Sequence, residues 1–225
     1  MRSKLNPKFS VKKAHELQNA LSKKLSFADS LPERIRYVAG VDVAYLGSLS
    51  VGAVAVLDYE TLTLVEHQVA LVPTRIPYVP TLLSFREIPP AVSAIKRLSV
   101  EPDVFMVDGQ GFAHPYGLGF ASHLGLILGK PVVGVAKSLL CGKIEETDAQ
   151  QGVRLLKLNG KTIGAQVVTR MGTKPVFVSV GNLVSLERAV SLVLECVGRY
   201  RLPEPIRCAH RCAGDEKRRL LGCGV

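Results

Sequence analysis

Apolar residues change their spacing along the chain, and the change predicts its secondary structure. In residues 11–25, alanine and leucine recur at helical spacing among lysines and polar residues, which predicts a helix with one apolar stripe. Residues 36–46, 52–57 and 62–72 instead alternate or form short apolar runs, which is typical of strands. The connections between these runs are short, so we expect three antiparallel strands in a meander.

The middle of the chain switches between helical and strand patterns. A pair of prolines interrupts the helical period of residues 82–98, which predicts two helices or one sharp kink. Apolar runs at 104–107 and 132–135 flank a helical segment at 118–128. We interpret this order as two buried parallel strands joined by a helix, because such strands are apolar throughout.

The C-terminal part continues with shorter elements. An Asn-Gly pair at 159–160 predicts a hairpin between strands at 152–158 and 162–169. Beyond it we expect a short strand at 175–179, a helix at 186–197 and a last short helix that contains His210. No repeat, low-complexity segment or linker divides the chain, so we expect a single α/β domain over residues 1–225.

The composition is that of a soluble globular chain with an excess of positive charge. Hydrophobic residues make up 47% and charged residues 21% of the 225 residues, and the net charge is +10. This excess makes a polyanion the first partner to consider, although a basic enzyme without such a partner would have the same composition.

We expect an intracellular, cytoplasmic protein without a membrane span. The most apolar region, 120–136, is broken by His123, Lys130 and Pro131. The N-terminus has basic residues but no apolar core of signal-peptide length. The five cysteines are odd in number and irregular in spacing, so we interpret them as reduced thiols.

The stretch 104–115, VFMVDGQGFAHP, places a carboxylate at the end of a buried strand. Asp108 ends the strand, and two glycines and a histidine follow at Gly109, Gly111 and His114. Ligands of open α/β sheets bind beyond the carboxyl ends of strands, and glycines permit close backbone approach. The position therefore suits a metal ion and a ligand; an aspartate that caps a turn is the alternative.

Asp42, Glu87 and Asp108 are the candidate metal ligands. Asp42 lies in the middle of a strand, where an unpaired carboxylate is rarely buried. If this strand neighbours the one that ends at Asp108, the two carboxylates face each other, and Glu87 on a helix closes a third side. Three acidic oxygens on separate elements suit Mg²⁺ or Mn²⁺. The alternatives are a bulge or turn residue for Asp42 and a salt-bridged or solvated Glu87.

A divalent cation on a basic protein favours hydrolysis of phosphodiester bonds. Lys137, directly after the second parallel strand, is placed to contact the scissile phosphate, and His210 to orient water. A solvated lysine and a structural histidine are the alternatives. Tyr78 lies in a stiff proline loop, where an exposed aromatic can wedge into a base stack or pack against its own loop.

Seven motifs, in order over nearly the whole chain, resemble the endonuclease V family of deoxyinosine 3′ endonucleases. They are VAGVD at 38–42, PYVP at 77–80, FRE at 85–87, VDGQGFAHP at 107–115, LGFASHLG at 118–125, VGVAKSLLCG at 133–142 and LPEPIR at 202–207. The resemblance implies an RNase H-like α/β fold, with a mixed five-stranded sheet of three antiparallel then two parallel strands, flanked by helices.

The resemblance also implies an activity. A monomeric, Mg²⁺-dependent enzyme, for which Mn²⁺ can substitute, would cleave DNA containing deoxyinosine, or inosine-containing RNA, at the second phosphodiester bond 3′ to the inosine. The products would carry 3′-hydroxyl and 5′-phosphate ends.

Residue roles follow from the same motifs. Asp42, Glu87 and Asp108 would hold the metal, His210 would lie near it, and Lys137 would touch the scissile phosphate. Tyr78 would be the wedge. The flipped hypoxanthine would occupy a pocket lined by Leu83, Gly109, Gln110, Gly111 and His114. Backbone amides at the glycines would recognise its O6 and N7 acceptors, where adenine presents a donor.

The chain departs from the family pattern at three positions. Tyr116 replaces the usual arginine after AHP, so a phosphate contact is not assumed there. Asn182 replaces a histidine after Gly181, and Ile88 replaces a glycine after FRE.

Two further interpretations stay open: a different RNase H-like nuclease, which needs no base pocket, and a non-catalytic nucleic-acid-binding module, which needs no carboxylates.

Overall fold

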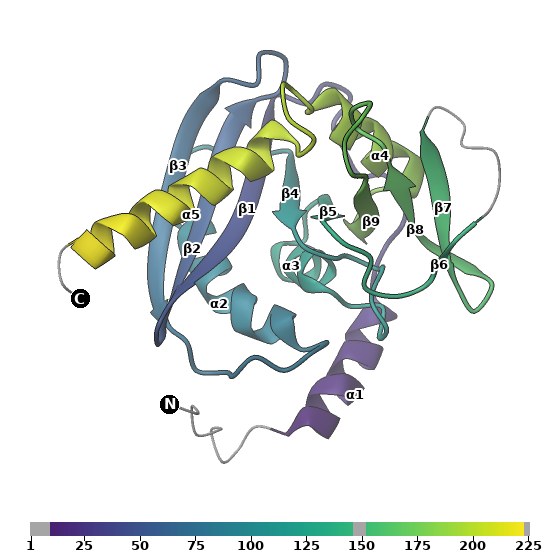
Figure 1. The fold of residues 1–225 in the computed structure, drawn as a ribbon, viewed down its shortest axis with the longest axis horizontal. Helices are drawn as coiled ribbons and strands as arrows, with labels where there is room; N and C mark the ends of the chain where they lie inside the picture. The colour runs from purple at the N-terminus through teal and green to yellow at the C-terminus, as the bar shows by residue number, and fades with distance from the viewer. Residues whose placement is uncertain (1–9, 146–151, 223–225) are drawn as a thin grey trace.

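A computed structural model describes residues 10–145 and 152–222, which form one mixed sheet with helices on both faces (Figure 1). The strands are β1 (Tyr37–Leu46), β2 (Leu49–Asp58), β3 (Leu64–Pro73), β4 (Val104–Asp108), β5 (Val132–Ala136), β6 (Lys143–Ile144), β7 (Val153–Leu158), β8 (Lys161–Val167) and β9 (Val176–Asn182). The helices are α1 (Val11–Ser22), α2 (Leu83–Ile95), α3 (Phe120–Leu128), α4 (Leu186–Glu195) and α5 (Glu204–Gly222).

The sheet has nine strands in the order β3-β2-β1-β4-β5-β9-β8-β7-β6. Its first part confirms the expected meander, since β1, β2 and β3 pair antiparallel and β4 and β5 run parallel to β1. The predicted total of five strands is wrong. The strand β9 pairs antiparallel with β5, and the hairpin of β7 and β8 extends the sheet from there. The sequence predicted these three strands, the hairpin from its Asn-Gly turn, but not the edge at which they pair.

The structure decides the form of two helices. Of the two alternatives expected for residues 82–98, two helices or one kinked helix, it excludes the first, because α2 runs through Pro89 and Pro90 as one element. Each proline removes one backbone hydrogen bond, and packing of this segment on β2 stabilises the helix in spite of that loss. The helix α5 is not short but 19 residues long, because an apolar stripe with Ala209, Ala213 and Leu220 continues at helical spacing to its end.

Each face of the sheet has its own apolar core. Helices α4 and α5 pack on the face of Val38, Met106 and Val133, and helices α2 and α3 pack on the face of Val41 and Val107. In Figure 1, α5 crosses in front of β1, β2 and β3, with which it is in contact. The two helices that carry candidate site residues, α2 and α5, therefore approach the sheet from opposite faces.

A glycine on each face lets one of these helices come close. A Cβ atom at Gly40 in β1 would lie 1.8 Å from the carbonyl oxygen of Pro205 in α5. A Cβ atom at Gly52 in β2 would lie 2.2 Å from the carbonyl oxygen of Pro90 in α2. Any side chain at either position would push its helix outward. These two contacts set how near α2 and α5 bring Glu87 and His210 to the sheet.

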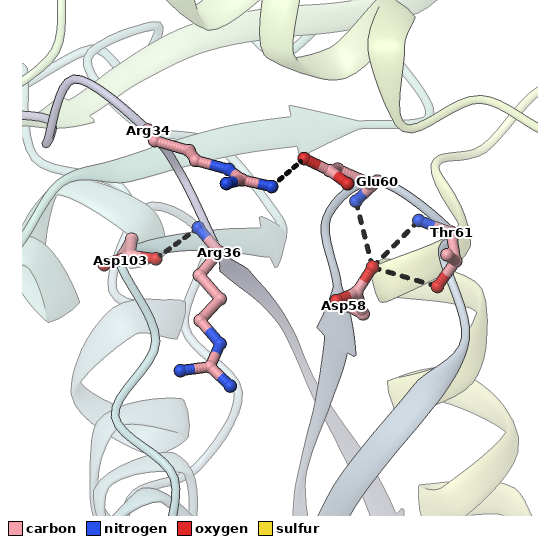
Figure 2. Close-up of polar contacts among 6 residues, drawn as sticks. All are labelled: Arg34, Arg36, Asp58, Glu60, Thr61 and Asp103. Atoms are coloured by element: carbon pink, nitrogen blue, oxygen red, sulfur yellow. Dashed lines mark hydrogen bonds and ion pairs between the residues drawn. The ribbon is translucent and has the colours of Figure 1, made fainter.

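Polar contacts fasten the start of β1 to its neighbours (Figure 2). A carboxylate oxygen of Asp103 accepts hydrogen bonds from the backbone N–H groups of Arg36 at 2.8 Å and Tyr37 at 2.9 Å. The exposed side chain of Arg34 pairs with Glu60 at 2.7 Å across the end of the sheet. These contacts fix the start of β1 beside β4, and thus the depth at which Asp42 lies.

No helix within residues 10–145 and 152–222 is long and apolar enough to span a membrane. The four cysteines of this part of the chain are Cys141, Cys196, Cys208 and Cys212, and all are free thiols. Cys223 lies outside the described residues.

Candidate metal and nucleic-acid site

Asp42 and Asp108 lie side by side on neighbouring parallel strands. The pair Val41 and Val107 is in register between β1 and β4, so the carboxylates occupy the next position of each strand. Asp42 is also in regular register with Ala53 of β2, which excludes the bulge or turn alternative. One ligand atom each from Asp42, Asp108 and His210 lies within 4.8 Å of the other two. The strand adjacency that the metal hypothesis required is therefore present.

His210 reaches this pair from α5. Its Nδ1 atom lies 2.7 Å from a carboxylate oxygen of Asp42. The imidazole itself is 67% exposed, so its other face is open to a ligand from solvent. Sequence spacing alone could not join residue 210 to residue 42; the close packing of α5 on Gly40 does.

Glu87 approaches from the opposite face on α2. It is only 8% exposed, which excludes the solvated-face alternative, and the Tyr45 hydroxyl donates to it at 3.4 Å. Burial raises the pKa of the Glu87 carboxyl well above its usual range, and the charges of Asp42 and Asp108 raise it further. Glu87 therefore interacts electrostatically with the two aspartates. It is not among the three residues whose ligand atoms lie within 4.8 Å of one another.

Lys137 lies beside Asp108 at the end of β5. Its ammonium group is 2.5 Å from an Asp108 carboxylate oxygen, so it is not simply a solvated lysine. Burial and the neighbouring Asp42 raise the pKa of Asp108, and Lys137 opposes that shift. The lysine thus partly neutralises the cluster, and its ammonium can turn to an incoming anion.

The donor set of this cluster fits a hard divalent cation. Carboxylate oxygens with a nearby imidazole are ligands that Mg²⁺ and Mn²⁺ accept. Burial, and to a smaller extent the neighbouring carboxylates, raise the pKa values of Glu87 and Asp108, so their ionised forms are unfavourable here and a bound cation would relieve that cost. Asp42, Glu87 and Asp108, with His210 beside them, are the residues that could hold it.

The glycine loop after β4 is packed more tightly than expected. The N–H of Gly109 donates to the carbonyls of Val107 and Val135, and the N–H of Gly111 donates to the Ser179 hydroxyl at 2.9 Å. Both glycine amides are thus engaged with protein acceptors, which argues against our expectation that they face a base. Of the described residues, none accepts a hydrogen bond from the N–H of Gln110, which lies between them.

His114 holds this loop from inside. It is buried, its Nδ1 accepts the backbone N–H of Tyr116 at 3.2 Å, and burial lowers its pKa to about 4. Its ring is therefore neutral and supports the loop conformation. The role of His114 and Leu83 in a base pocket stays a prediction; Leu83 is the half-buried first residue of α2.

The proline loop between β3 and α2 presents Tyr78 to solvent. Tyr78 is 66% exposed, so it does not pack within its own loop. The loop ends at Thr81, whose positive φ of 71° is unfavourable for a β-branched residue. Two side chains of α1 fasten it there: Gln18 donates to the Thr81 carbonyl at 2.8 Å, and His15 bonds the Thr81 hydroxyl at 2.9 Å. Neither contact can be recognised in the sequence, because polar residues on an amphipathic helix carry no signal of a partner more than 60 residues away.

Two of the departures from the family pattern have structural partners. The Tyr116 ring stacks on His15, with centroids 4.1 Å apart. Asn182 accepts a hydrogen bond from the backbone N–H of Ser26 at 3.0 Å and donates to the Gly125 carbonyl. Both residues therefore tie the N-terminal segment to the rest of the molecule.

A family model described as Endonuclease V matches residues 19–211. This chain belongs to the endonuclease V family. An endonuclease V from Thermofilum pendens is 45% identical over 208 residues, which are 92% of this chain and 89% of that protein. Another from Rippkaea orientalis is 43% identical over 210 residues, with 92% and 91% covered.

Solved structures of endonuclease V agree with this fold. The crystal structure of a Streptomyces avermitilis endonuclease V superposes with a TM-score of 0.87 at 35% identity, covering 94% of this chain and 95% of that one. A Ciona intestinalis endonuclease V in complex with a 24mer DNA containing an inosine followed by a ribo-adenosine has a TM-score of 0.82 at 28% identity, with 93% and 98% covered.

Proposed function

We propose that this chain is a Mg²⁺-dependent endonuclease that recognises inosine in DNA, or in RNA, and cleaves the second phosphodiester bond 3′ to it. The observation that carries the proposal is the approach of Asp42, Asp108 and His210 within 4.8 Å, beside the buried Glu87 and the exposed Lys137. The Ciona relative with inosine-containing DNA supports the substrate class. We take the RNase H-like description of the fold and a monomeric enzyme as parts of the same proposal.

The carboxylates of Asp42, Glu87 and Asp108 would hold the cation. Bound Mg²⁺ supplies Lewis-acid chemistry: it polarises a phosphoryl oxygen and makes water more acidic. Lys137 turns from Asp108 to the scissile phosphate and offsets its negative charge. His210, oriented by its Nδ1 contact with Asp42, presents Nε2 to solvent, where it can accept a proton from the attacking water.

Inosine recognition would use the loops beside this cluster. Tyr78, exposed on a loop fastened to α1, would fill the gap left by an extruded base. The N–H of Gln110 would donate to O6 of hypoxanthine, because its glycine neighbours already use theirs. Adenine presents an amino donor in place of O6, so the same N–H group would disfavour it.

One assay tests the proposal: cleavage of matched inosine- and adenine-containing oligonucleotides, as DNA and as RNA, with and without Mg²⁺. We expect the wild type to cleave inosine substrates only when Mg²⁺ is present. The Asp42→Ala variant should lose this cleavage and keep most of its affinity for the substrate. Asp215→Ala, which removes an exposed carboxylate of α5, is the matched control and should cleave normally. Unchanged cleavage by Asp42→Ala would refute the metal assignment, and equal cleavage of adenine substrates would favour a generic nuclease.

A further inference from the structure

A hollow of about 460 Å³ lies between the β8–β9 loop and the segment before α5. Four arginines line it with one aromatic ring: Arg170, Arg199, Arg201, Arg207 and Tyr200. We call this the arginine hollow. None of the described residues that line it is acidic. Four guanidinium groups around an open hollow make a site for an anion with several negative oxygens.

Backbone carbonyls hold two of these arginine side chains in place. Arg170 donates to the Arg199 carbonyl at 2.6 Å, and Arg201 donates to the carbonyls of Lys174 and Pro175 at 3.2 Å. Each of these two arginines uses a single guanidinium nitrogen for its contacts, which leaves further donors for a ligand. The side chains of Arg170 and Arg201 are therefore positioned before a ligand arrives, which lowers the entropic cost of binding.

Arg207 is held in two ways. Its guanidinium stacks on the Tyr200 ring at 3.6 Å, and it pairs with Glu204 at 2.6 Å. Glu204 offsets part of its charge, so we assign the anion contact mainly to Arg170, Arg199 and Arg201.

A second arginine-lined hollow provides a contrast. It contains Arg34 and Arg36 near the start of β1 and is lined by Asp58 and Glu60 as well, so its charges balance. Figure 2 shows Arg34 paired with Glu60 there. An excess of positive charge is thus a property of the arginine hollow and not of every arginine pair on this surface.

The arginine hollow is continuous with the candidate metal site. A neighbouring hollow shares Leu202 and Arg207 with it and extends to His210, which contacts Asp42. In the sheet, Phe177 of β9 pairs with Ala136 of β5, so the β8–β9 loop lies next to Lys137. The loop of Tyr78 leads directly into α2, which packs on the opposite face of the sheet from α5. The metal site therefore lies between the Tyr78 loop and the arginine hollow.

We propose that the arginine hollow binds the phosphodiester backbone of the substrate strand on the 3′ side of the scissile phosphate. The 5′-to-3′ direction of the strand across the protein rests on the proposed function, in which inosine lies at the Tyr78 loop and cleavage occurs 3′ to it. The strand then leaves the metal site past His210 and Arg207 toward Arg170 and Arg199. Tyr200 provides an aromatic surface beside the backbone contacts.

The test compares the double variant Arg170→Gln/Arg199→Gln with the wild-type protein and with Arg34→Gln/Arg36→Gln, which loses the same charge at the other hollow. Affinity for an inosine-containing duplex is measured without divalent metal over a salt series. We expect the first variant to bind roughly tenfold more weakly, with the slope of log K against log salt reduced by about two, one for each lost phosphate contact. The control variant should lose much less affinity.

Truncated duplexes test the polarity. Removing the 3′ flank of the inosine strand should abolish the difference between variant and wild type, whereas removing the 5′ flank should preserve it. If the double variant folds poorly, Arg199→Gln alone serves, since its guanidinium lies 6.0 Å from the Tyr200 ring and donates no hydrogen bond within the described residues. That single variant should reduce the slope by about one.

The two proposals fail in different ways. Two results would overturn the assignment of the arginine hollow and leave the proposed inosine cleavage intact. One is an equal loss of duplex affinity in both double variants. The other is a difference in affinity between Arg170→Gln/Arg199→Gln and the wild type that remains when the 3′ flank is removed. If instead the wild type cleaves no inosine substrate and the variant still loses affinity for the duplex, the proposed function fails and the phosphate site stands without its polarity.

Discussion

Nδ1 of His210 lies 2.7 Å from a carboxylate oxygen of Asp42, so helix α5 reaches the middle of the first strand. This contact fixes the imidazole beside the carboxylate cluster, while most of the side chain stays exposed. It requires the close approach of Pro205 to Gly40, since one turn and a half of helix separates Pro205 from His210.

Replacing His210 tests its part in catalysis. We expect His210→Ala to lower kcat about 100-fold, the lower end of the usual contribution of a proton-transfer group, with little change in KM. Its side chain is 67% exposed, so the free energy of unfolding should change by no more than about 0.5 kcal/mol. Steady-state kinetics and urea denaturation measure both, with exposed His67→Ala as control. An unchanged kcat would assign His210 a structural role only.

Glu87 should destabilise the protein when no cation is bound. Its pKa is raised in the fold, so folding costs more as the pH rises above its ordinary value of 4.5, where the unfolded chain ionises freely. Glu87→Gln removes this penalty and should stabilise the metal-free protein at pH 8 by at least about 1 kcal/mol. Thermal unfolding with and without Mg²⁺ measures the effect.

The same experiment carries its own control. Mg²⁺ should stabilise the wild type and stabilise Glu87→Gln much less, because the variant lacks one ligand charge. At pH 4, below the ordinary pKa, the two proteins should unfold at similar temperatures. A variant that is less stable than the wild type at pH 8 without metal would contradict the electrostatic account.

Tyr78 should determine discrimination and not stability. We expect Tyr78→Ala to reduce the preference for inosine over adenine about tenfold, which is the loss of roughly 1.4 kcal/mol of stacking. The melting temperature should not change, because the ring is 66% exposed. Tyr78→Phe keeps the aromatic surface and should keep the preference. Competition between the inosine and adenine oligonucleotides measures this preference. An unchanged preference in Tyr78→Ala would refute the role of Tyr78 as a wedge.

Two buried histidines should limit stability in acid. Burial lowers the pKa of His114 and His123 to about 4, below the ordinary value of 6.5. The unfolded chain therefore binds more protons than the fold between these values, and stability falls as the pH drops from 6.5 to 4. Each histidine contributes up to about 3 kcal/mol to this loss.

His123→Gln should make that loss shallower. Glutamine does not ionise and can keep the contact that the His123 ring makes with the Ser84 hydroxyl at 3.3 Å. Urea denaturation at pH 7, 5.5 and 4.5 measures the slope, and exposed His67→Gln should leave it unchanged. Identical slopes for wild type and His123→Gln would show that this histidine is not neutral in the fold.

Local patterns determined most of the elements before any tertiary information. Alternation and short apolar runs predicted β1 to β5 and the β7–β8 hairpin, since the period of apolar residues reflects which faces are buried. The family motifs marked Asp42, Glu87 and Asp108 by their place in the sequence. These features depend on near neighbours in the chain, and a single sequence contains that information.

Tertiary structure alone decided how distant segments meet. The pairing of β9 with β5 made nine strands of the expected five, because edge pairing depends on which strand edge is free in space. Gly40 and Gly52 brought α5 and α2 close, and hydrogen bonds to Val135 and Ser179 engaged the glycine amides. The arginine hollow joins residues 170 and 199–207, whose proximity no spacing predicts. Contacts of this kind depend on packing between elements far apart in the chain, which local periodicity does not contain.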